Sequence, residues 1–397
     1  MDDAERNDCL LGDLITLQRG YDITKKEQSE GPYPVVSSSG PISTHIAYTD
    51  VGPGVVIGRK GTLGKAFYIK GPYWAHDTTL WVKDFKGNDR KFVFYLLKSM
   101  NLAVYDVGSS NPTLNRNHLH LLPVRAPDVD KQQRIAHILS AYDDLIEVNL
   151  RRSAILEDMA RRLFDEWFVR FRYPHHEAVP LVETELGMIP DGWQIETARQ
   201  ALVYTGGGTP SKSEPSYWLD GDVQWFTPTD LTKSGQTFLR RSSLMITKEG
   251  LAKSSARWFP ALSIMMTSRA TLGVFAINTE PATTNQGFIT FIPSSRTPVY
   301  FLLHMLKREF PRMEAVASGA TFKEITKGAL GELVFAFPPE HLAHRFEQLV
   351  TPMMEQIAIV SRQNDSLRAA RDLLLPKLIS GEIDVSTAEE TFAEAAE

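Results

Sequence analysis

The sequence contains a single cysteine, Cys9, among its 397 residues, which excludes an intrachain disulfide and any metal site built from several cysteines. No apolar run reaches the ~18 residues that a membrane-spanning helix needs. The N-terminal stretch MDDAERND is acidic and lacks the apolar core of a secretory signal. These absences predict a cytoplasmic protein with no membrane contact.

Signatures of catalysis are also missing. The stretch GRKGTLGKA at 58–66 is similar to a phosphate-binding loop, but Arg59 stands where the pattern needs its first glycine, and Ala66 replaces the magnesium-binding Ser or Thr. There is no HExxH zinc motif and no Asn/Asp-Pro-Pro-Tyr/Phe motif of amino-methyltransferases. We therefore expect no catalytic residue, no metal and no cofactor in this chain.

One carboxylate pair, Asp143-Asp144, keeps a nuclease open as an alternative, because nucleases hold magnesium between clustered carboxylates. Adjacent residues of a helix do not face each other. A solvated helix face or a contact with a partner protein is therefore the favoured interpretation of this pair.

The charge balance is slightly acidic, with 43 Lys and Arg against 48 Asp and Glu and a net charge of −5. Nucleic-acid binding usually needs a basic face. The acidic excess lies mainly in 339–397, whereas 1–127 and 180–338 are close to neutral and slightly basic. We expect these two segments to allow DNA binding, but weakly in the isolated chain, because few phosphates can be neutralised.

The second half of the chain repeats the first at an offset of about 206 to 211 residues. GRKGTLG at 58–64 corresponds to TSRATLG at 267–273, and FYLL at 94–97 corresponds to YFLL at 300–303. Each half then continues into a short strand ending in proline and a long helix. Because internal repeats decide the architecture, we expect one ancestral unit used twice, as a pseudo-twofold internal repeat.

Two long helices are predicted by apolar residues at alternating spacings of three and four, from Ile135 to Leu163 and from Phe346 to Leu378. Each helix would have about 40 residues and a length of about 60 Å. We expect an antiparallel coiled coil in which Asn149 and Asn364 fix the register. The alternative is that each helix packs only on its own globular unit.

Proline should also disturb the second helix. Pro352 lies within it and should kink or locally break it.

The remaining segments are rich in Val, Ile, Thr, Tyr and Phe, with turn residues at short intervals, which indicates short strands. The predicted fold class is α+β, with two globular domains separated by the coiled coil. The predicted order is a first domain at 1–127, a helix at 128–172, a linker at 173–192, a second domain at 193–338, a helix at 339–379 and an acidic C-terminal tail at 380–397.

Polar and basic residues suited to nucleic acid occupy turns of both domains. Arg can bond guanine with two hydrogen bonds, Asn and Gln pair with adenine, and Lys, Ser and Thr suit phosphates. The parallel placement of Arg59-Lys60 and Arg269 in the repeat favours those two turns. The candidate DNA-binding residues are Ser38, Ser39, Arg59, Lys60, Thr62, Lys65, Ser110, Asn111 and Arg116 in the first domain, and Ser268, Arg269, Thr271, Asn285, Gln286 and Lys323 in the second.

The whole order resembles the DNA-specificity subunit of Type I restriction–modification systems. The resemblance covers nearly the whole chain and rests on LGDLITLQRGYDI at 11–23, PDVDKQQRIAHILSAYDDLI at 127–146, LGMIPDGW at 186–193 and LLLPKLISGEI at 373–383. The second helix departs from the pattern, because it opens with PPEHLAHRF where the family usually has a Glu-Gln pair, and Glu382 stands where a basic residue is common. These departures concern the contacts with other subunits.

The resemblance implies that each domain is a target-recognition domain reading one half of a bipartite double-stranded DNA target. The helices would set the spacing and dock two methyltransferase subunits, which carry S-adenosylmethionine and the adenine-N6 chemistry. Restriction and translocase subunits, which use ATP and Mg²⁺, would join them in phage defence. The chain itself would be non-catalytic. A coiled-coil protein scaffold without direct DNA readout is the alternative.

Overall fold

The computed structural model describes residues 7–106, 112–319 and 322–386. Two of the candidate residues, Ser110 and Asn111, lie outside these ranges. The chain divides into two compact units, which we call unit 1 (Met1–Glu147 and Asp365–Glu397) and unit 2 (Val148–Asn364). Both unit boundaries fall inside long helices.

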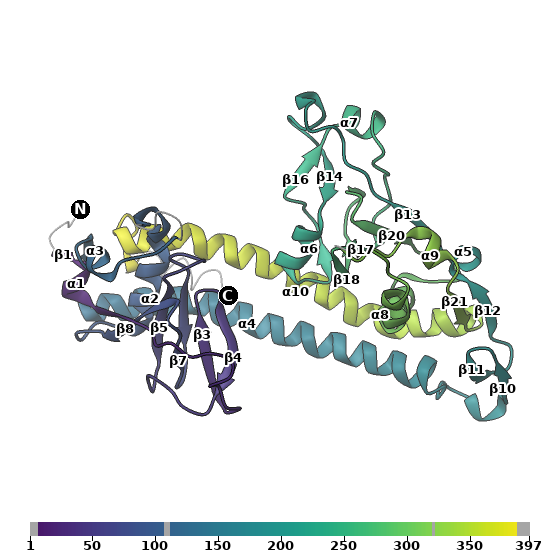
Figure 1. Ribbon diagram of the computed structural model, residues 1–397, viewed down its shortest axis with the longest axis horizontal. Coiled ribbons are helices and arrows are strands. Elements are labelled where there is room, and N and C mark those ends of the chain that lie inside the picture. The colour runs from purple at the N-terminus through teal and green to yellow at the C-terminus, as the bar shows by residue number, and fades with distance from the viewer. Residues whose placement is uncertain (1–6, 107–111, 320–321, 387–397) are drawn as a thin grey trace. The chain divides into compact units, whose positions relative to one another are not determined.

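Unit 1 is built on short strands in two sheets, with strand orders β2-β8-β5-β6 and β4-β3-β7, and on a separate pair of β1 with β9. The central strand β5 reads GVVIG and is buried along its whole length, as expected for a strand covered on both faces. In order, the elements traced in Figure 1 are β1 (Asn7–Leu10), α1 (Leu11–Leu14), β2 (Thr16–Arg19), β3 (Tyr33–Ser37), β4 (Gly40–His45), β5 (Gly54–Gly58), β6 (Ala66–Ile69), β7 (Trp74–Ala75), β8 (Thr79–Asp84), α2 (Arg90–Ser99), η2 (Leu102–Tyr105), α3 (Arg116–His120) and β9 (Pro123–Ala126).

Unit 2 has a five-stranded sheet of order β13-β20-β17-β18-β15, a three-stranded sheet of order β16-β14-β19, and the pairs β12–β21 and β10–β11. In Figure 1 the three-stranded sheet projects away from the long helices. In order, its elements are η4 (His176–Ala178), β10 (Leu181–Thr184), β11 (Gly187–Pro190), β12 (Gln194–Thr197), α5 (Ala198–Ala201), β13 (Val203–Gly206), η5 (Pro215–Tyr217), β14 (Val223–Phe226), α6 (Pro228–Ser234), β15 (Phe238–Leu239), β16 (Leu244–Ile246), α7 (Lys248–Ala252), β17 (Ile264–Arg269), β18 (Thr271–Asn278), β19 (Ala282–Thr284), β20 (Phe288–Ile292), α8 (Val299–Ala315), α9 (Lys327–Gly331) and β21 (Val334–Phe337).

The long helices are α4 (Val129–Phe164), which ends in the π-helical turn η3 (Asp165–Val169), and α10 (Glu340–Ser380). Within unit 2 they pack antiparallel: Asn149 bonds Asn364, whereas Phe164, fifteen residues further on, has its ring 5.7 Å from that of Phe346. Both also contribute to the core of unit 2, where Phe346 and Val350 are buried. In unit 2 the helices therefore pack on each other and on the globular part.

The seam of α4 departs from the expected stripe. Leu145 and Met159 are 48% and 47% exposed, while Ile146 and Ala160 are buried in their place. The buried residue follows the expected one by a single position at both places, so the buried stripe is offset by a constant one residue, which the drift of about 20° per heptad from a strict 3.5 repeat is too small to produce over two heptads. The expected break at Pro352 is wrong, because α10 continues through it, and Pro352 lies on the exposed side of the helix.

Two segments expected to be irregular carry ordered structure. The presumed linker 173–192 contains the antiparallel hairpin of β10 with β11, and Tyr173 and Ile189 within it are buried. At the other end, α10 stops before Gly381, whose φ of 79° suits a helix C-terminus. Beyond it, Val385 is buried in the core of unit 1, so the tail expected from 380 begins later.

The glycines of the two repeated Thr-Leu-Gly stretches share a left-handed conformation, with φ of 70° at Gly64 and 74° at Gly273. At Gly273 a Cβ would lie 2.2 Å from the ring of Phe310. We expect Gly273→Ala to lower the free energy of unfolding by about 2–4 kcal/mol, from backbone strain plus overpacking.

The matched control is Gly235→Ala, since Gly235 has a φ of 61° but no atom within 4 Å of its Cβ position. It should show only the backbone cost of about 1–2 kcal/mol. Urea unfolding of both variants measures the difference. Equal losses would mean that the contact with Phe310 relaxes freely.

Candidate nucleic-acid interface

Four loops of unit 1 meet beyond the end of β5. The backbone N–H groups of Arg59 and Lys60 both donate to the carbonyl of Thr78, at 2.8 and 3.0 Å, and the N–H of Leu114 donates to the carbonyl of Arg59 at 2.9 Å. The N–H of Ser38 donates to the hydroxyl of Thr78 at 3.3 Å. Backbone bonds thus gather residues that lie far apart in the sequence.

Charged side chains surround Asp77 at this place. Its carboxylate lies 3.4 Å from Nη2 of Arg19 and 3.9 Å from Nζ of Lys60, and Nη1 of Arg59 donates to its backbone carbonyl at 3.3 Å. We call Arg19, Arg59, Lys60 and Asp77 the Asp77 cluster. Burial, and then the neighbouring Arg19, lower the pKa of Arg59, but a guanidinium still stays charged at neutral pH.

The other candidates in unit 1 are placed less closely. Ser39 lies in the β3–β4 turn, where its hydroxyl is 2.9 Å from that of Ser37. Thr62 is exposed in the loop after β5, and Arg116 is exposed at the start of α3. Lys65 places its ammonium over the ring of Phe67, 5.2 Å from the centroid. The geometry therefore joins Ser38, Arg59 and Lys60 and leaves these four around them.

The same pattern of backbone bonds recurs in unit 2. The N–H of Ser268 donates to the carbonyl of Gly287, and the N–H of Ile325 donates to the carbonyl of Ser268, both at 2.8 Å. Arg269 forms a bridge with Glu324, as Lys60 does with Thr113. By position, Ser268 corresponds to Arg59 and Arg269 corresponds to Lys60. Both pairs are separated by 209 residues, the same offset that separates the two Thr-Leu-Gly stretches.

The side chains of unit 2 differ from those of unit 1 at equivalent places. Nε of Arg269 lies 3.8 Å from Glu324, and the exposed Gln286 accepts a hydrogen bond from Thr209. Asn285 accepts the N–H of Gly287 at 2.9 Å, which holds the turn. The remaining candidates are Thr271 and Lys323, both exposed, and Ser268, which is buried.

Ser268 and Gln286 line a cleft of about 430 Å³, together with two cations that the sequence reasoning missed, Arg257 and Lys327. Lys327 is the counterpart of Arg116, because each begins a short helix after a residue, Thr326 or Asn115, whose side chain accepts a backbone N–H. Carrying Arg116 along the repeat by 211 residues would have found it. Arg257 has no such signal.

The triple glycine 206–208 is a tightly packed segment. A Cβ on Gly207 would lie 2.0 Å from the carbonyl of Asn285, and one on Gly208 would lie 2.3 Å from Ser255. The glycines allow this segment to approach the turn that carries Gln286.

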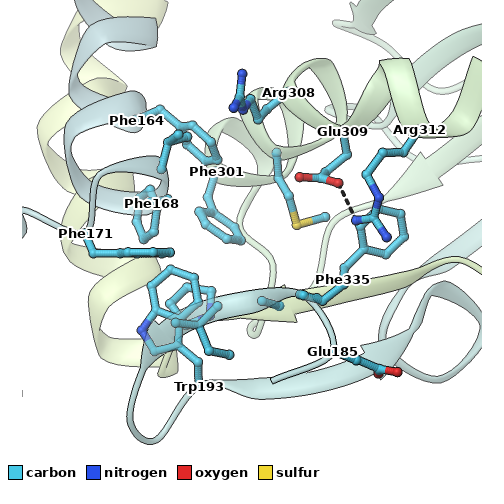
Figure 2. A pocket seen from close by; sticks show the side chains of 16 residues that line it. Phe164, Phe168, Phe171, Glu185, Trp193, Phe301, Arg308, Glu309, Arg312 and Phe335 are labelled. Carbon is cyan, nitrogen blue, oxygen red and sulfur yellow. Dashed lines mark hydrogen bonds and ion pairs between the residues drawn. The ribbon is translucent and has the colours of Figure 1, made fainter. Parts of the chain in front are cut away.

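A larger pocket of unit 2, about 520 Å³, is lined mainly by apolar side chains, several of them aromatic. Figure 2 shows Phe164, Phe168, Phe301 and Trp193 around it, with Glu309 and Arg312 bonded to each other at its edge. That carboxylate is already paired, and no candidate DNA-binding residue lines the pocket. We assign it to the packing of the end of α4 against α8 and the β10–β11 hairpin.

Two groups that could serve in catalysis, Asp143 and His304, are paired and neutral respectively. Asp143 pairs with Arg371 and accepts the hydroxyl of Tyr95 at 2.7 Å, which contradicts a free Asp143-Asp144 metal site. Burial lowers the pKa of His304 to about 3, so its ring is neutral at pH 7. Across residues 7–106, 112–319 and 322–386, no three His, Cys, Asp or Glu gather as a metal site, and no helix is both long and apolar enough to span a membrane.

Two units with the same loop arrangement, each continuous with a long helix, define a binding protein with duplicated recognition units. A model of the family described as the Type I restriction modification DNA specificity domain matches residues 7–158 and again 190–365. The chain therefore belongs to this family, as its sequence motifs indicate. Chains of this family are non-catalytic and read DNA targets, so the scaffold alternative is not favoured.

Two relatives illustrate the likeness. The chain is 30% identical over 203 residues to the MjaIX specificity subunit of Methanocaldococcus jannaschii, covering 51% of this chain and 46% of the relative. It is 25% identical over 359 residues to the HindI specificity subunit of Haemophilus influenzae, covering 74% and 77%. The match to the first relative therefore spans less than half of that protein's length.

A solved structure agrees with the mixed helix and sheet fold. The S subunit of a Type I restriction–modification system from M. genitalium superposes with a TM-score of 0.57 at 15% identity, covering 96% of this chain and 97% of that one. This likeness supports the fold alone.

Proposed function

We propose that this chain is the DNA-specificity subunit of a Type I restriction–modification complex and reads a bipartite double-stranded target, one half-site with each unit. The observation that carries this is the recurrence of the same loop arrangement, around Arg59-Lys60 in unit 1 and around Ser268-Arg269 in unit 2. A duplicated reader suits a target in two parts, because each unit can present its loops to one major groove.

The long helices serve as the spacer in this proposal. Antiparallel packing of α4 with α10, with the buried pair Asn149–Asn364 setting register, supports a coiled coil that relates the two units by a pseudo-twofold axis. Its length then sets the number of unread base pairs between the half-sites.

Partner subunits supply the chemistry. Apolar side chains remain exposed along both helices and suit protein docking: Leu145, Val148, Leu150, Ile155 and Met159 on α4, and Leu349, Ile359 and Leu373 on α10. We propose that two methyltransferase subunits dock there, that restriction and translocase subunits join them, and that S-adenosylmethionine, ATP and Mg²⁺ bind to these partners in the cytoplasm. Basic partner surfaces would add the DNA affinity that this nearly neutral chain lacks.

Domain exchange tests whether each unit reads one half-site independently of the other. Replacing residues 1–127, which end just after β9, with those of a relative of different specificity should change one half-site of the modified motif and leave the other intact. Sequencing of modified bases, after co-expression with the partner methyltransferase, reads both halves at once. A change in both halves would refute separate reading, and no bipartite motif with the unaltered chain would refute the proposed function.

A further inference from the structure

Arg19, the last residue of β2, lies in the stretch 11–23 that carries the family resemblance, and its side chain has contacts that the stretch alone does not reveal. Its side chain is 47% exposed, and its Nη2 lies 3.3 Å from Asp22 and 3.4 Å from Asp77. Of the two carboxylates, Asp77 is largely buried and Asp22 is exposed. Arg19 is therefore an exposed guanidinium whose position is fixed by the largely buried carboxylate of Asp77.

A two-bond contact with a guanine would use the Nη1–Nη2 edge of this guanidinium, with Nη2 exchanging its contact to the exposed Asp22 for the base. Within the described residues, Nε and Nη1 of Arg19 have no hydrogen-bond partner. Arginine recognises guanine by donating two hydrogen bonds to O6 and N7 in the major groove. An arginine already ordered by a carboxylate loses less side-chain entropy when it makes that contact.

Unit 2 has no arginine–aspartate pair at the position equivalent to Arg19 and Asp77. Arg19 pairs with Leu80 between β2 and β8, and Gly206 pairs with Ile289 between β13 and β20, 209 residues after Leu80. The place of Asp77 is taken by Gln286, and Lys327 lies over Gly206, with its Nζ 3.4 Å from the Cβ position. The backbone is thus shared while the side chains at this position differ, as two half-sites of different sequence require.

We propose that Arg19 reads a guanine in the half-site of unit 1 and that Asp77 is its positioning residue, an inference that rests on the proposed function. Lys60, beside the carboxylate of Asp77, and Arg59, bonded to the backbone carbonyl of Asp77, are left to contact phosphates. Unit 2 reads its half-site without this pair.

The first test uses Arg19→Ala in the full complex with its methyltransferase subunits. We expect one guanine of one half-site to become degenerate in the modified motif, and the binding ratio of target to single-mismatch DNA at that position to fall about 10-fold or more. The other half-site should not change. Arg125→Ala is the control. Arg125 is an exposed arginine on β9 of the same unit, and its Nε lies 2.7 Å from the carboxylate of Asp8. This substitution should leave the motif intact.

The second test uses Asp77→Asn, which separates positioning from folding. Removing one negative charge beside three cations should raise affinity for non-target DNA, with a steeper salt dependence, while the ratio of target to non-target binding falls. A merely structural role would weaken binding to both DNAs. Fluorescence anisotropy at several salt concentrations measures both quantities.

The outcomes also separate this inference from the proposed function. If the unaltered complex modifies no bipartite motif, the proposed function fails. If it modifies one and Arg19→Ala still discriminates fully at every guanine, the inference about Arg19 is wrong and the proposed function stands. A loss of both target and non-target binding by Asp77→Asn would reduce Asp77 to a structural residue and overturn its positioning role.

Discussion

Inserting one heptad into each long helix should lengthen the gap between the two modified half-sites by about three base pairs. Seven helical residues add about 10 Å, and each base pair of B-DNA occupies about 3.4 Å. The insertions belong after Ser153 in α4 and after Val360 in α10, because antiparallel packing places Asn149 against Asn364 and so brings these two positions near each other. A heptad that keeps the apolar spacing preserves the seam.

Sequencing of modified bases measures the gap directly. A control chain in which residues 153–159 are replaced by a different heptad of the same pattern should keep the original gap, because its length is unchanged. Insertion into α4 alone should abolish modification, because the residues of α4 beyond the insertion would no longer face their partners on α10. An unchanged gap in the double insertion would mean that the helices do not set the spacing.

Asn149→Leu should lower the free energy of unfolding by about 1–3 kcal/mol, because it leaves a buried amide without a partner. Nδ2 of Asn149 donates to Oδ1 of Asn364 at 3.0 Å, and the two residues are 4% and 2% exposed. Replacing both with leucine should recover most of that loss, since no buried polar group is then unsatisfied. The double variant should also tolerate shifted pairings, which the amide pair prevents.

Chemical denaturation of the two single variants and the double variant gives the coupling energy between the residues. Gln363→Leu serves as the control, because Gln363 neighbours Asn364 but is exposed, and its effect should stay within about 0.5 kcal/mol. If Asn149→Leu costs no more than this control, the pair does not stabilise the helix packing.

The loop arrangement of the candidate site could be anticipated from the repeat. The Thr-Leu-Gly stretches align Arg59-Lys60 with Ser268-Arg269, and the backbone bonds of the two units agree with that alignment. Burial could not be anticipated in the same way: Ser268 has the residue type of a DNA contact but lies inside the unit. Residue type describes what a side chain can bond, whereas accessibility depends on strands that are distant in the chain.

Arg19 shows the converse: the sequence does not indicate that this residue belongs to the candidate site. It is an ordinary arginine at the end of a short strand, and only the pairing of β2 with β8 brings it to Asp77, 58 residues later. Likewise, the composition of 173–192 suggested a linker, but a two-stranded antiparallel hairpin needs no long apolar run to form. Periodicity does not detect contacts of this kind.

The sequence by itself determined the two helices, the duplicated order, the polar pair Asn149 and Asn364 and the family, because periodic spacing and motifs are local properties that survive without knowledge of the fold. Tertiary structure alone decided which polar residues reach the surface together. It placed Arg19 with Asp77, Lys327 with Gly206 and Asp143 with Arg371. The physical reason is that hydrogen bonds and ion pairs act over a few ångströms in space, and only folding brings residues so distant in the chain within that range.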